Sequence, residues 1–494
     1  MGNRIMAVAS VAIALAALIG TVLPAHAQDI VAVQKTTPTA KFEPYRFEAA
    51  DGTVVEAERG EFAVPENRSD PNSRTIKLGF VRFASTAAKP GPPIVYLAGG
   101  PGGSGVGTAR RERFPLFMAL REVADVIAFD QRGTGWSNSI PRCDAGRAYP
   151  LDQALTRDRA IAFMREQART CVGFWKTSGV DLAGYTTWES AADLDDLRQA
   201  LGADRITLWG ISYGSHLALA TLKRYPDRID KAVLASIEDL DETVKLPALT
   251  DAFFARMQAV IDADEKAANH SDLAGLMRGV FDKLDSKPVT VQVSTKGGDR
   301  IDLVIGKFDV QLLVSGMIAD PTTQAYLPIM FAGMAAGEFN ELGQAIHDRI
   351  RSDFGRFANG MPEAMDTASG ITARRLALVK RQARTSLLGD ALNYPMPHLA
   401  GAYGVPDLGD TFRAPVRSTV PTLFLSGTLD GRTYPESAAE TAAGFSNATH
   451  VLIENAGHNL FMLSPEITRT MLAFLQGKPI ERKRIVLPVP KYQY

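Results

Sequence analysis

Short, nearly continuous apolar runs constrain the fold of this chain more than any other feature. Most of them are followed by a stretch with helical periodicity, such as ESAADLDDLRQALG before RITLWGIS. Apolar runs that alternate with helices are typical of strands buried on both faces of a mostly parallel sheet. We therefore predict an α/β fold with helices on both faces of a central sheet, whose strands are PPIVYLAGG, ADVIAFDQRG, RITLWGIS, KAVLAS, TVPTLFLSG and THVLIENAG.

The pattern changes in an opening segment and in a long insertion. From Tyr45 to Phe83 apolar and polar residues alternate around an Asp51-Gly52 turn, which predicts antiparallel opening strands. Between Leu240 and Pro415 the chain is largely helical, with a hairpin that turns at Gly297-Gly298. Roughly 175 residues between two strands are too many for a loop. The expected division is a core formed by residues 28–239 and 416–494, and a cap (lid) formed by residues 240–415.

The N-terminus has the layout of a secretory signal peptide. Arg4 supplies a positive charge, AVASVAIALAALIGTVL is apolar, and the tripeptide AHA before Gln28 is a small-x-small cleavage signal. We expect residues 1–27 to be removed and the mature protein to be periplasmic or secreted. The alternative is an uncleaved membrane anchor, because the stretch from Ile5 to Leu23 is nearly long enough to span a bilayer.

Charge and cysteine content limit the classes of partner. Lys and Arg number 54 and Asp and Glu number 55, a balance that gives no support for nucleic acid or anionic membrane as a partner. We expect no stable membrane association after signal cleavage. In an exported chain, the pair Cys143 and Cys171 suggests a disulfide, and the alternative is two buried free thiols. No Cys/His ligand cluster is visible, so we expect neither a metal nor another cofactor.

A serine stands where one apolar run turns into a helical stretch. The segment Gly210-Ile211-Ser212-Tyr213-Gly214 follows a predicted strand and precedes a predicted helix. G-x-S-x-G in this context is typical of a nucleophile elbow, and the alternative is a tight turn that needs small residues. In an elbow, Ser212 is the nucleophile and the Tyr213 N–H faces the oxyanion.

A nucleophilic serine needs a base and an acid that orients the base. His458 lies in a glycine-containing loop just after the last apolar run, and Asp430 follows the preceding run. The order Ser212, Asp430, His458 is the order found in α/β-hydrolases. Glu238 and Asp239, after KAVLAS, are rival acids, and a solvated loop histidine is the alternative for His458.

The loop LAGGPGGSG is the candidate for the second half of an oxyanion hole. Its glycines allow the backbone to approach a substrate closely, and we assign the Gly100 N–H as donor, with Gly99 as the alternative. A phosphate-binding loop is disfavoured because no lysine follows at the required spacing. Asp130 and Arg132 in FDQRGTG are interpreted as structural braces.

Together these motifs resemble one group of α/β-hydrolases. GGPGGSG, FDQRGTGWS, GISYG, LFLSGTLDGRT and ENAGH are similar to the prolyl aminopeptidase and tripeptidyl aminopeptidase group. GEFAVPENRSDPNSRTIKLGFVRF also resembles the opening strands of exported tripeptidyl-type members. The resemblance extends from about Gly60 to Phe474 and is weakest in the cap. Ala98 is a departure, since prolyl aminopeptidases usually have histidine before the Gly-Gly pair, and this favours the broader exported relatives.

The resemblance implies an α/β-hydrolase fold and a serine hydrolase that cleaves peptides from a free N-terminus, with Ser212, Asp430 and His458 as triad. Such an enzyme must hold the substrate's ammonium group, and Glu238 is our candidate, with Asp239 and Glu189 as alternatives. The expected partner is a peptide or a small amide or ester. A carboxylesterase or lactonase with the same triad is the rival enzyme, and a non-catalytic binding protein on a hydrolase scaffold is the rival outside enzymes.

Overall fold

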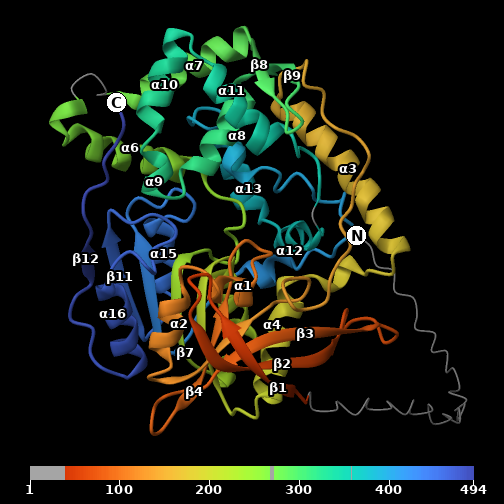
Figure 1. The fold of residues 1–494 in the computed structure, drawn as a ribbon, viewed down its shortest axis with the longest axis vertical. Helices are drawn as coiled ribbons and strands as arrows, with labels where there is room; N and C mark the ends of the chain where they lie inside the picture. Colours follow the sequence, from red (N-terminus) through yellow and green to blue (C-terminus); the bar gives the residue numbers. More distant parts are fainter. Residues whose placement is uncertain (1–38, 268–271, 358) are drawn as a thin grey trace, which may run out of the picture. The chain divides into compact units, whose positions relative to one another are not determined.

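The central sheet organises the fold. The computed structural model describes residues 39–267, 272–357 and 359–494, so the expected signal peptide lies outside the described residues. In the described part of the chain the sheet is 10-stranded, with the order β1-β2-β3-β5-β4-β6-β7-β10-β11-β12 (Figure 1). The predicted apolar runs form β4 Gly91–Leu97, β5 Ala124–Phe129, β6 Ile206–Ser212, β7 Ile229–Ile237, β10 Thr422–Gly427 and β11 Ala448–Glu454.

The middle of this sheet is parallel, as predicted. β4 pairs in parallel with β5 and β6, β7 pairs in parallel with β6 and β10, and β11 pairs in parallel with β10 and with the short β12, Arg484–Val486. The opening strands extend the sheet through antiparallel pairs. They are β1 Lys41–Glu48, β2 Val54–Pro65 and β3 Thr75–Phe83. The predicted turn lies between β1 and β2, where Gly52 has a φ of 85°.

Helices cover both faces of the sheet, because alternate strand residues point to opposite sides. In β4, Val95 and Leu97 belong to one buried cluster, while Ile94 and Tyr96 belong to another. The first cluster packs against α4 Thr187–Ala200, α5 Tyr213–Arg224 and α15 Pro435–Ala442. The second packs against α1 Gly105–Ala109, α2 Phe114–Leu120 and α16 Pro465–Leu475.

The segment between β7 and β10, the cap, has a hydrophobic core largely of its own. Phe253, Met277, Val310 and Phe331 are among its buried residues. The predicted hairpin is present as β8 Val289–Ser294 and β9 Arg300–Ile305, which pair antiparallel. The cap helices are α6 Pro247–Asp262, α7 Leu273–Ser286, α8 Lys307–Met317, α9 Pro321–Gln324, α10 Leu327–Ala336, α11 Asn340–Ile346, α12 Met361–Ser369, α13 Ala373–Gln382 and α14 Gly409–Arg413.

A long helix that the sequence pattern did not single out, α3 Arg157–Thr177, lies beside the cap (Figure 1). The loop that precedes it is bonded to cap residues. Leu155 donates its N–H to Asp309 Oδ2 at 3.0 Å, and the Val304 N–H donates to the Leu151 carbonyl at 2.8 Å. The segment between β5 and α4, which sequence analysis places in the core, therefore also supports the cap.

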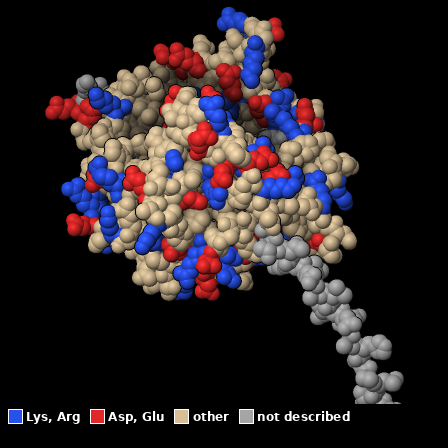
Figure 2. Space-filling model, turned by 60° about the horizontal axis from the view of Figure 1, so that its bottom comes forward, with Lys and Arg blue, Asp and Glu red and all other residues tan. Residues whose placement is uncertain are grey.

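The outer surface carries mixed charge. On the face drawn in Figure 2, acidic and basic side chains are interspersed, in keeping with the formal net charge of −1. Among the helices of the described residues, none combines the length and the apolar character that crossing a membrane requires.

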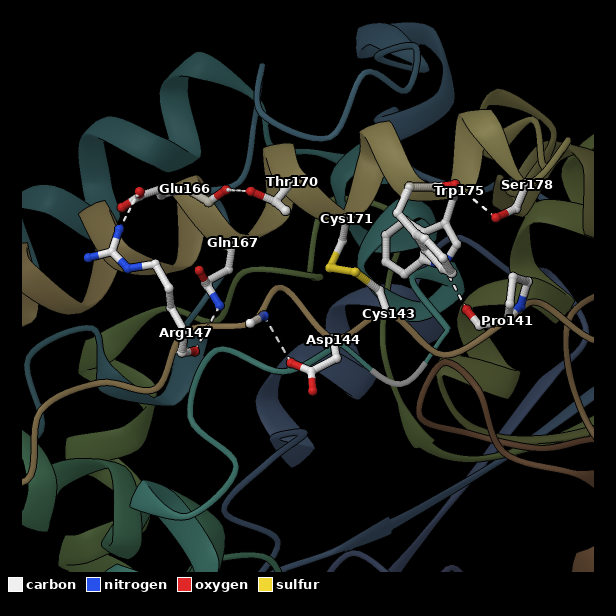
Figure 3. Close-up of a disulfide and its surroundings, with 12 residues drawn as sticks. Pro141, Cys143, Asp144, Arg147, Glu166, Gln167, Thr170, Cys171, Trp175 and Ser178 are labelled. Atoms are coloured by element: carbon white, nitrogen blue, oxygen red, sulfur yellow. Dashed lines mark hydrogen bonds and ion pairs between the residues drawn. A yellow bond between two sulfur atoms is a disulfide. The ribbon is translucent and has the colours of Figure 1, made fainter.

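The predicted disulfide between Cys143 and Cys171 is present, with the two Cα atoms 5.6 Å apart. It joins α3 to the loop after β5, and Trp175 Nε1 donates a hydrogen bond to the Pro141 carbonyl of the same loop at 2.8 Å (Figure 3). The backbone of Cys143 also forms an isolated antiparallel β-bridge with Phe357, which lies shortly before α12. The loop after β5 is thus tied to α3 by the disulfide and to the segment before α12 by the β-bridge.

Removing this disulfide should destabilise the protein without changing its fold. We expect the double variant Cys143→Ala, Cys171→Ala to lose about 3 kcal/mol of unfolding free energy, because an open loop gives the unfolded chain more freedom. Urea unfolding followed by circular dichroism measures the loss. Thiol titration of denatured, unreduced wild type should detect no free thiol at Cys143 or Cys171. Two titratable thiols would contradict the disulfide.

Candidate active site

Ser212 lies on a sharp bend between β6 and α5. Its φ is 55° and its ψ is −129°, a conformation uncommon for a residue with a side chain. The neighbouring glycines explain why the chain accepts this bend. A Cβ at Gly214 would lie 2.0 Å from the Leu97 carbonyl oxygen, and one at Gly210 would lie 2.5 Å from the Gly214 oxygen. Only glycines permit these contacts, so Ser212 is held at the carboxyl edge of the sheet.

His458 and Asp430 are brought together at the ends of β11 and β10. His458 Nδ1 donates to Asp430 Oδ2 at 2.9 Å. Thr433 donates to the same carboxylate from its hydroxyl at 2.7 Å and from its N–H at 2.9 Å. Burial acts to raise the pKa of Asp430, but His458 and these hydrogen bonds outweigh it and hold the pKa below its usual value. The carboxylate is therefore ionised and fixes the orientation of the His458 ring.

The loop after β4 approaches the serine closely. A Cβ at Gly99 would lie 2.9 Å from Ser212 Cβ and 3.5 Å from Ser212 Oγ. Gly100 has a φ of 124° and lines the same cavity as Ser212. Gln131 Nε2 donates to the Ala98 carbonyl at 3.0 Å and helps to hold the loop. The loop is therefore next to the serine, where a second oxyanion donor is needed.

Asp130 and Arg132 make contacts that suit structural braces. Asp130 Oδ1 accepts hydrogen bonds from Ser104 Oγ at 2.7 Å and from the Val106 N–H at 3.1 Å. Arg132 is fully buried and forms an ion pair with Asp193 at 2.7 Å. These bonds fix the loops after β4 and β5, and neither side chain lines the cavity at Ser212.

The cavity at Ser212 has a volume of about 140 Å³, which is small beside the ~300–1,000 Å³ usual for ligand sites. A larger cavity of about 570 Å³ lies between the cap and residues 154–157, and Ser212 and His458 do not line it. The lining of the smaller cavity is rich in charged groups. It comprises Gly100, Ser212, Glu238, Thr243, Lys245, Pro362, Glu363, Asp366, Leu392, Asn393, Tyr394, Pro395, Met396, Arg432 and Thr433.

Glu238, the sequence candidate for the ammonium group, lines this cavity but already has a cation partner. Lys245 Nζ lies 2.6 Å from Glu238 Oε2. Burial acts to raise the pKa of Glu238, but Lys245 and His216 lower it below the usual value. The Glu238 N–H donates a hydrogen bond to Ser215 Oγ at 2.9 Å, which fixes the backbone at this position. The charge of Glu238 is therefore balanced before any substrate arrives.

The two alternative candidates lie outside the cavity lining. Glu189 forms an ion pair with Arg68 at 2.6 Å. Asp239 is half-buried, and burial together with the nearby Glu242 raises its pKa to about 6. Neither residue lines the cavity at Ser212.

Sequence reasoning missed the two acidic residues that α12 contributes to this cavity. Burial raises the pKa of Glu363, and burial together with the charge of Glu238 raises the pKa of Asp366 well above its usual value. Within the described part of the chain, neither residue forms an ion pair. No motif in the cap sequence marked them. Core contacts hold α12 in place, since Asn359 Nδ2 donates to the Gly133 carbonyl at 3.0 Å and Pro362 packs against Gly102.

Two family models match the chain. The model described as alpha/beta hydrolase fold matches residues 92–300, and the model described as TAP-like protein matches residues 403–483. These matches contain the elbow and the loops of Asp430 and His458, respectively. Together with the parallel sheet they confirm the fold class and the family resemblance expected from the sequence.

The chain is also similar to curated peptidases. It is 32% identical over 188 residues to serine protease Hip1 of Mycobacterium tuberculosis, which covers 36% of each chain. It is 30% identical over 189 residues to the tripeptidyl aminopeptidase of Streptomyces lividans, covering 36% of this chain and 35% of that one. It is 31% identical over 147 residues to the proline iminopeptidase of Xylella fastidiosa, covering 30% and 33%. The matched region spans about a third of each relative's length.

The close approach of the β4 loop to Ser212 can be tested with a single methyl group. In Gly99→Ala, the new Cβ displaces Ser212 or the loop, and we expect the rate of Ser212 labelling by a fluorophosphonate to fall about 10²-fold, a typical cost of a misplacement near 1 Å. Gly91→Ala is the matched control, because its Cβ would meet nothing closer than 3.6 Å. Equal labelling of both variants, with unchanged melting temperatures, would contradict the proximity.

Proposed function

We propose that this chain, an α/β-hydrolase with a TAP-like C-terminal region, is a serine peptidase that cleaves peptides from a free N-terminus. The observation that carries the proposal is the composition of the cavity at Ser212. It places a strained serine, a glycine loop and the carboxylates of Glu238, Glu363 and Asp366 around one small space. Such a site suits a substrate with a cationic end next to the bond that is cut.

The proposed chemistry is acyl transfer. Ser212 Oγ attacks the scissile carbonyl carbon while His458 takes the serine proton, and the carbonyl oxygen becomes an oxyanion that the N–H groups of Tyr213 and Gly100 stabilise. The C–N bond then breaks, and His458 gives the proton to the leaving amine. Water, activated by His458, attacks the acyl-enzyme and releases the acid and free Ser212. Asp430 orients the ring throughout.

The amino terminus is held by the acidic wall of the cavity. An ammonium group taken out of water needs an anionic partner, because a buried unpaired charge is very costly. Glu238 is already balanced by Lys245, so Asp366 and Glu363 supply the charge that the substrate neutralises. A neutral ester offers these acidic groups no cation and gains nothing from them, which favours a peptide with a free N-terminus over the carboxylesterase alternative.

Export is part of the proposal. The signal-peptide pattern before Gln28 and the Cys143–Cys171 disulfide both support a periplasmic or secreted location, since disulfides persist in oxidising compartments. N-terminal sequencing of the protein recovered from its native compartment tests it, and a chain that retains residues 1–27 would contradict signal cleavage.

The triad assignment predicts strong and unequal losses of turnover. Ser212→Ala should lower kcat about 10⁶-fold, and Asp430→Asn should lower it about 10⁴-fold, because the ring then takes the wrong tautomer. Both variants should fold, which circular dichroism checks. Steady-state assays on a short peptide measure the losses, and near-normal turnover by Ser212→Ala free of wild-type contamination would refute the assignment.

The ammonium site predicts a large cost of acetylation. We expect N-acetylation of a peptide substrate to lower kcat/KM by about two to four powers of ten, since carboxylates would be buried without their cation. Asp366→Asn and Glu363→Gln should each lower kcat/KM for the free peptide and reduce the penalty for acetylation. Glu341→Gln, on the exposed start of α11, is the control. Equal cutting of acetylated and free peptides would exclude an aminopeptidase.

The same site predicts a pH dependence with a defined sign. Below their raised pKa values Asp366 and Glu363 are protonated and cannot attract a cation, so kcat/KM should rise as pH increases through those values. It should fall again as the substrate's own amino group, with a pKa of about 7.7–8.0, loses its proton. In Asp366→Asn, part of the rise of kcat/KM at low pH should disappear. If the pH dependence of kcat/KM is unchanged in this variant, the rise is due to other groups.

A further inference from the structure

One cation in the cavity at Ser212 is not used by the proposed reaction. Arg432 lines the cavity, is half-buried and follows the triad candidate Asp430 on the same loop. Its N–H donates to Asp430 Oδ1 at 2.8 Å, which fixes the backbone of the loop. Its guanidinium donates from Nη1 to the Ser315 carbonyl at 3.3 Å, and no carboxylate of the described residues forms an ion pair with it. Most donors of this guanidinium therefore remain free to bind a ligand.

The sheet order fixes where the loop of this cation lies relative to Ser212. Strands β4, β6, β7 and β10 lie in this order, so Ser212 after β6 stands between the glycine loop after β4 and the Arg432 loop after β10. Helix α12, which carries Glu363 and Asp366, lies across this edge of the sheet. Pro362 packs against Gly102 near the start of the helix, and the Tyr213 hydroxyl of α5 donates to Met365 Sδ at 2.9 Å. Glu363, Asp366 and Arg432 therefore line one small space, and Arg432 is close enough to Asp366 to act against the rise in the pKa of that carboxyl.

The proposed chemistry indicates which part of the substrate lies near Arg432. His458 must protonate the leaving amine, so the leaving part of the peptide lies toward His458. Arg432 lies on the loop whose Asp430 is hydrogen-bonded to His458. The acyl part, with its ammonium group, then lies toward α12, and the leaving part passes close to the guanidinium.

We propose that Arg432 binds a carboxylate on the leaving part of the substrate and so makes the enzyme selective for short peptides with a free C-terminus close to the cut. A planar guanidinium binds a carboxylate through two parallel hydrogen bonds, which gives both strength and geometric selectivity. The small cavity, about 140 Å³, favours a leaving part of a single residue, whose α-carboxylate then lies within reach. An Asp or Glu side chain on that residue presents the same chemistry. This inference rests on the proposed function.

The test compares matched peptides after the cleavage position has been determined by mass spectrometry. The first peptide leaves a single residue with a free α-carboxylate, the second leaves the same residue as its amide, and the third leaves an aspartate amide. Wild type should cut the free acid about 10- to 100-fold faster than the amide in kcat/KM, mainly through a lower KM. A faster rate for the aspartate amide than for a neutral amide would identify the side chain as the second source of the carboxylate.

Variants of Arg432 distinguish a role in carboxylate binding from a role in folding. In Arg432→Gln the ratio of acid to amide rates should fall to about one, and Arg432→Lys should keep part of it, because an ammonium retains the charge but not the paired hydrogen bonds. Arg417→Gln, an exposed arginine away from the cavity, should keep the wild-type ratio. The proposal is overturned if wild type cuts acid and amide equally, or if Arg432→Gln slows both by the same factor. Those outcomes differ from failure of the proposed function, which would appear as no cleavage of any free peptide.

Discussion

The backbone contact between Gly214 and Leu97 is the constraint on which the rest of the site depends. The strand β4, the strand β6 and the start of α5 meet there so closely that a Cβ would lie 2.0 Å from a carbonyl oxygen. At this meeting point Ser212 has a φ of 55°, and the Gly99 loop lies beside its side chain. Strained backbone of this kind costs about 1–3 kcal/mol, and the cores on both faces of the sheet hold it in place. The position of the nucleophile is thus a property of the packed sheet, not of a flexible loop.

Charge pairing distinguishes the groups that stabilise the site from those that await a ligand. Glu238 and Lys245 satisfy each other, as do Asp430 and His458. Glu363, Asp366 and Arg432 line the same cavity without ion pairs to described residues. Since a folded protein seldom keeps unpaired ionisable groups in a recess unless something binds there, these groups define the chemical character that a substrate must complement.

The sequence predicted the parts of the molecule that follow from local patterns. The strands from β4 to β11, the elbow at Ser212 and the loops of Asp430 and His458 carry apolar periodicity or glycines with a clear physical role, and the fold they predict is confirmed. The single pair of cysteines was also sufficient for the disulfide. The roles assigned to Ser212, Asp430, His458 and the oxyanion donors remain predictions, although their placement agrees with those roles.

Other parts could not be predicted because they depend on tertiary contacts. Asp366 and Glu363 are ordinary acidic residues of a helix, and tertiary packing of α12, on the Gly102 and Gly133 loops and against Tyr213 of α5, brings them to Ser212. Arg432 lies in the motif LFLSGTLDGRT, but a triad role for Asp430 is enough to account for that motif. The sequence alone therefore gives no reason to assign a function to the arginine. The ion pair between Glu238 and Lys245 could not be predicted from the sequence either, because spacing along the chain does not determine the distance between two side chains.

The attachment of α12 has a consequence for how such a protein can diverge. This helix is held by core loops at its start, and the bridge between Phe357 and Cys143 joins the preceding segment to the disulfide loop. The hydrophobic core of the cap, by contrast, is built around α6, α7, α8, α10 and the β8–β9 hairpin. Mutations that repack that outer body can accumulate while α12 keeps its attachment, so cap stability and substrate choice are exposed to selection as largely separate traits.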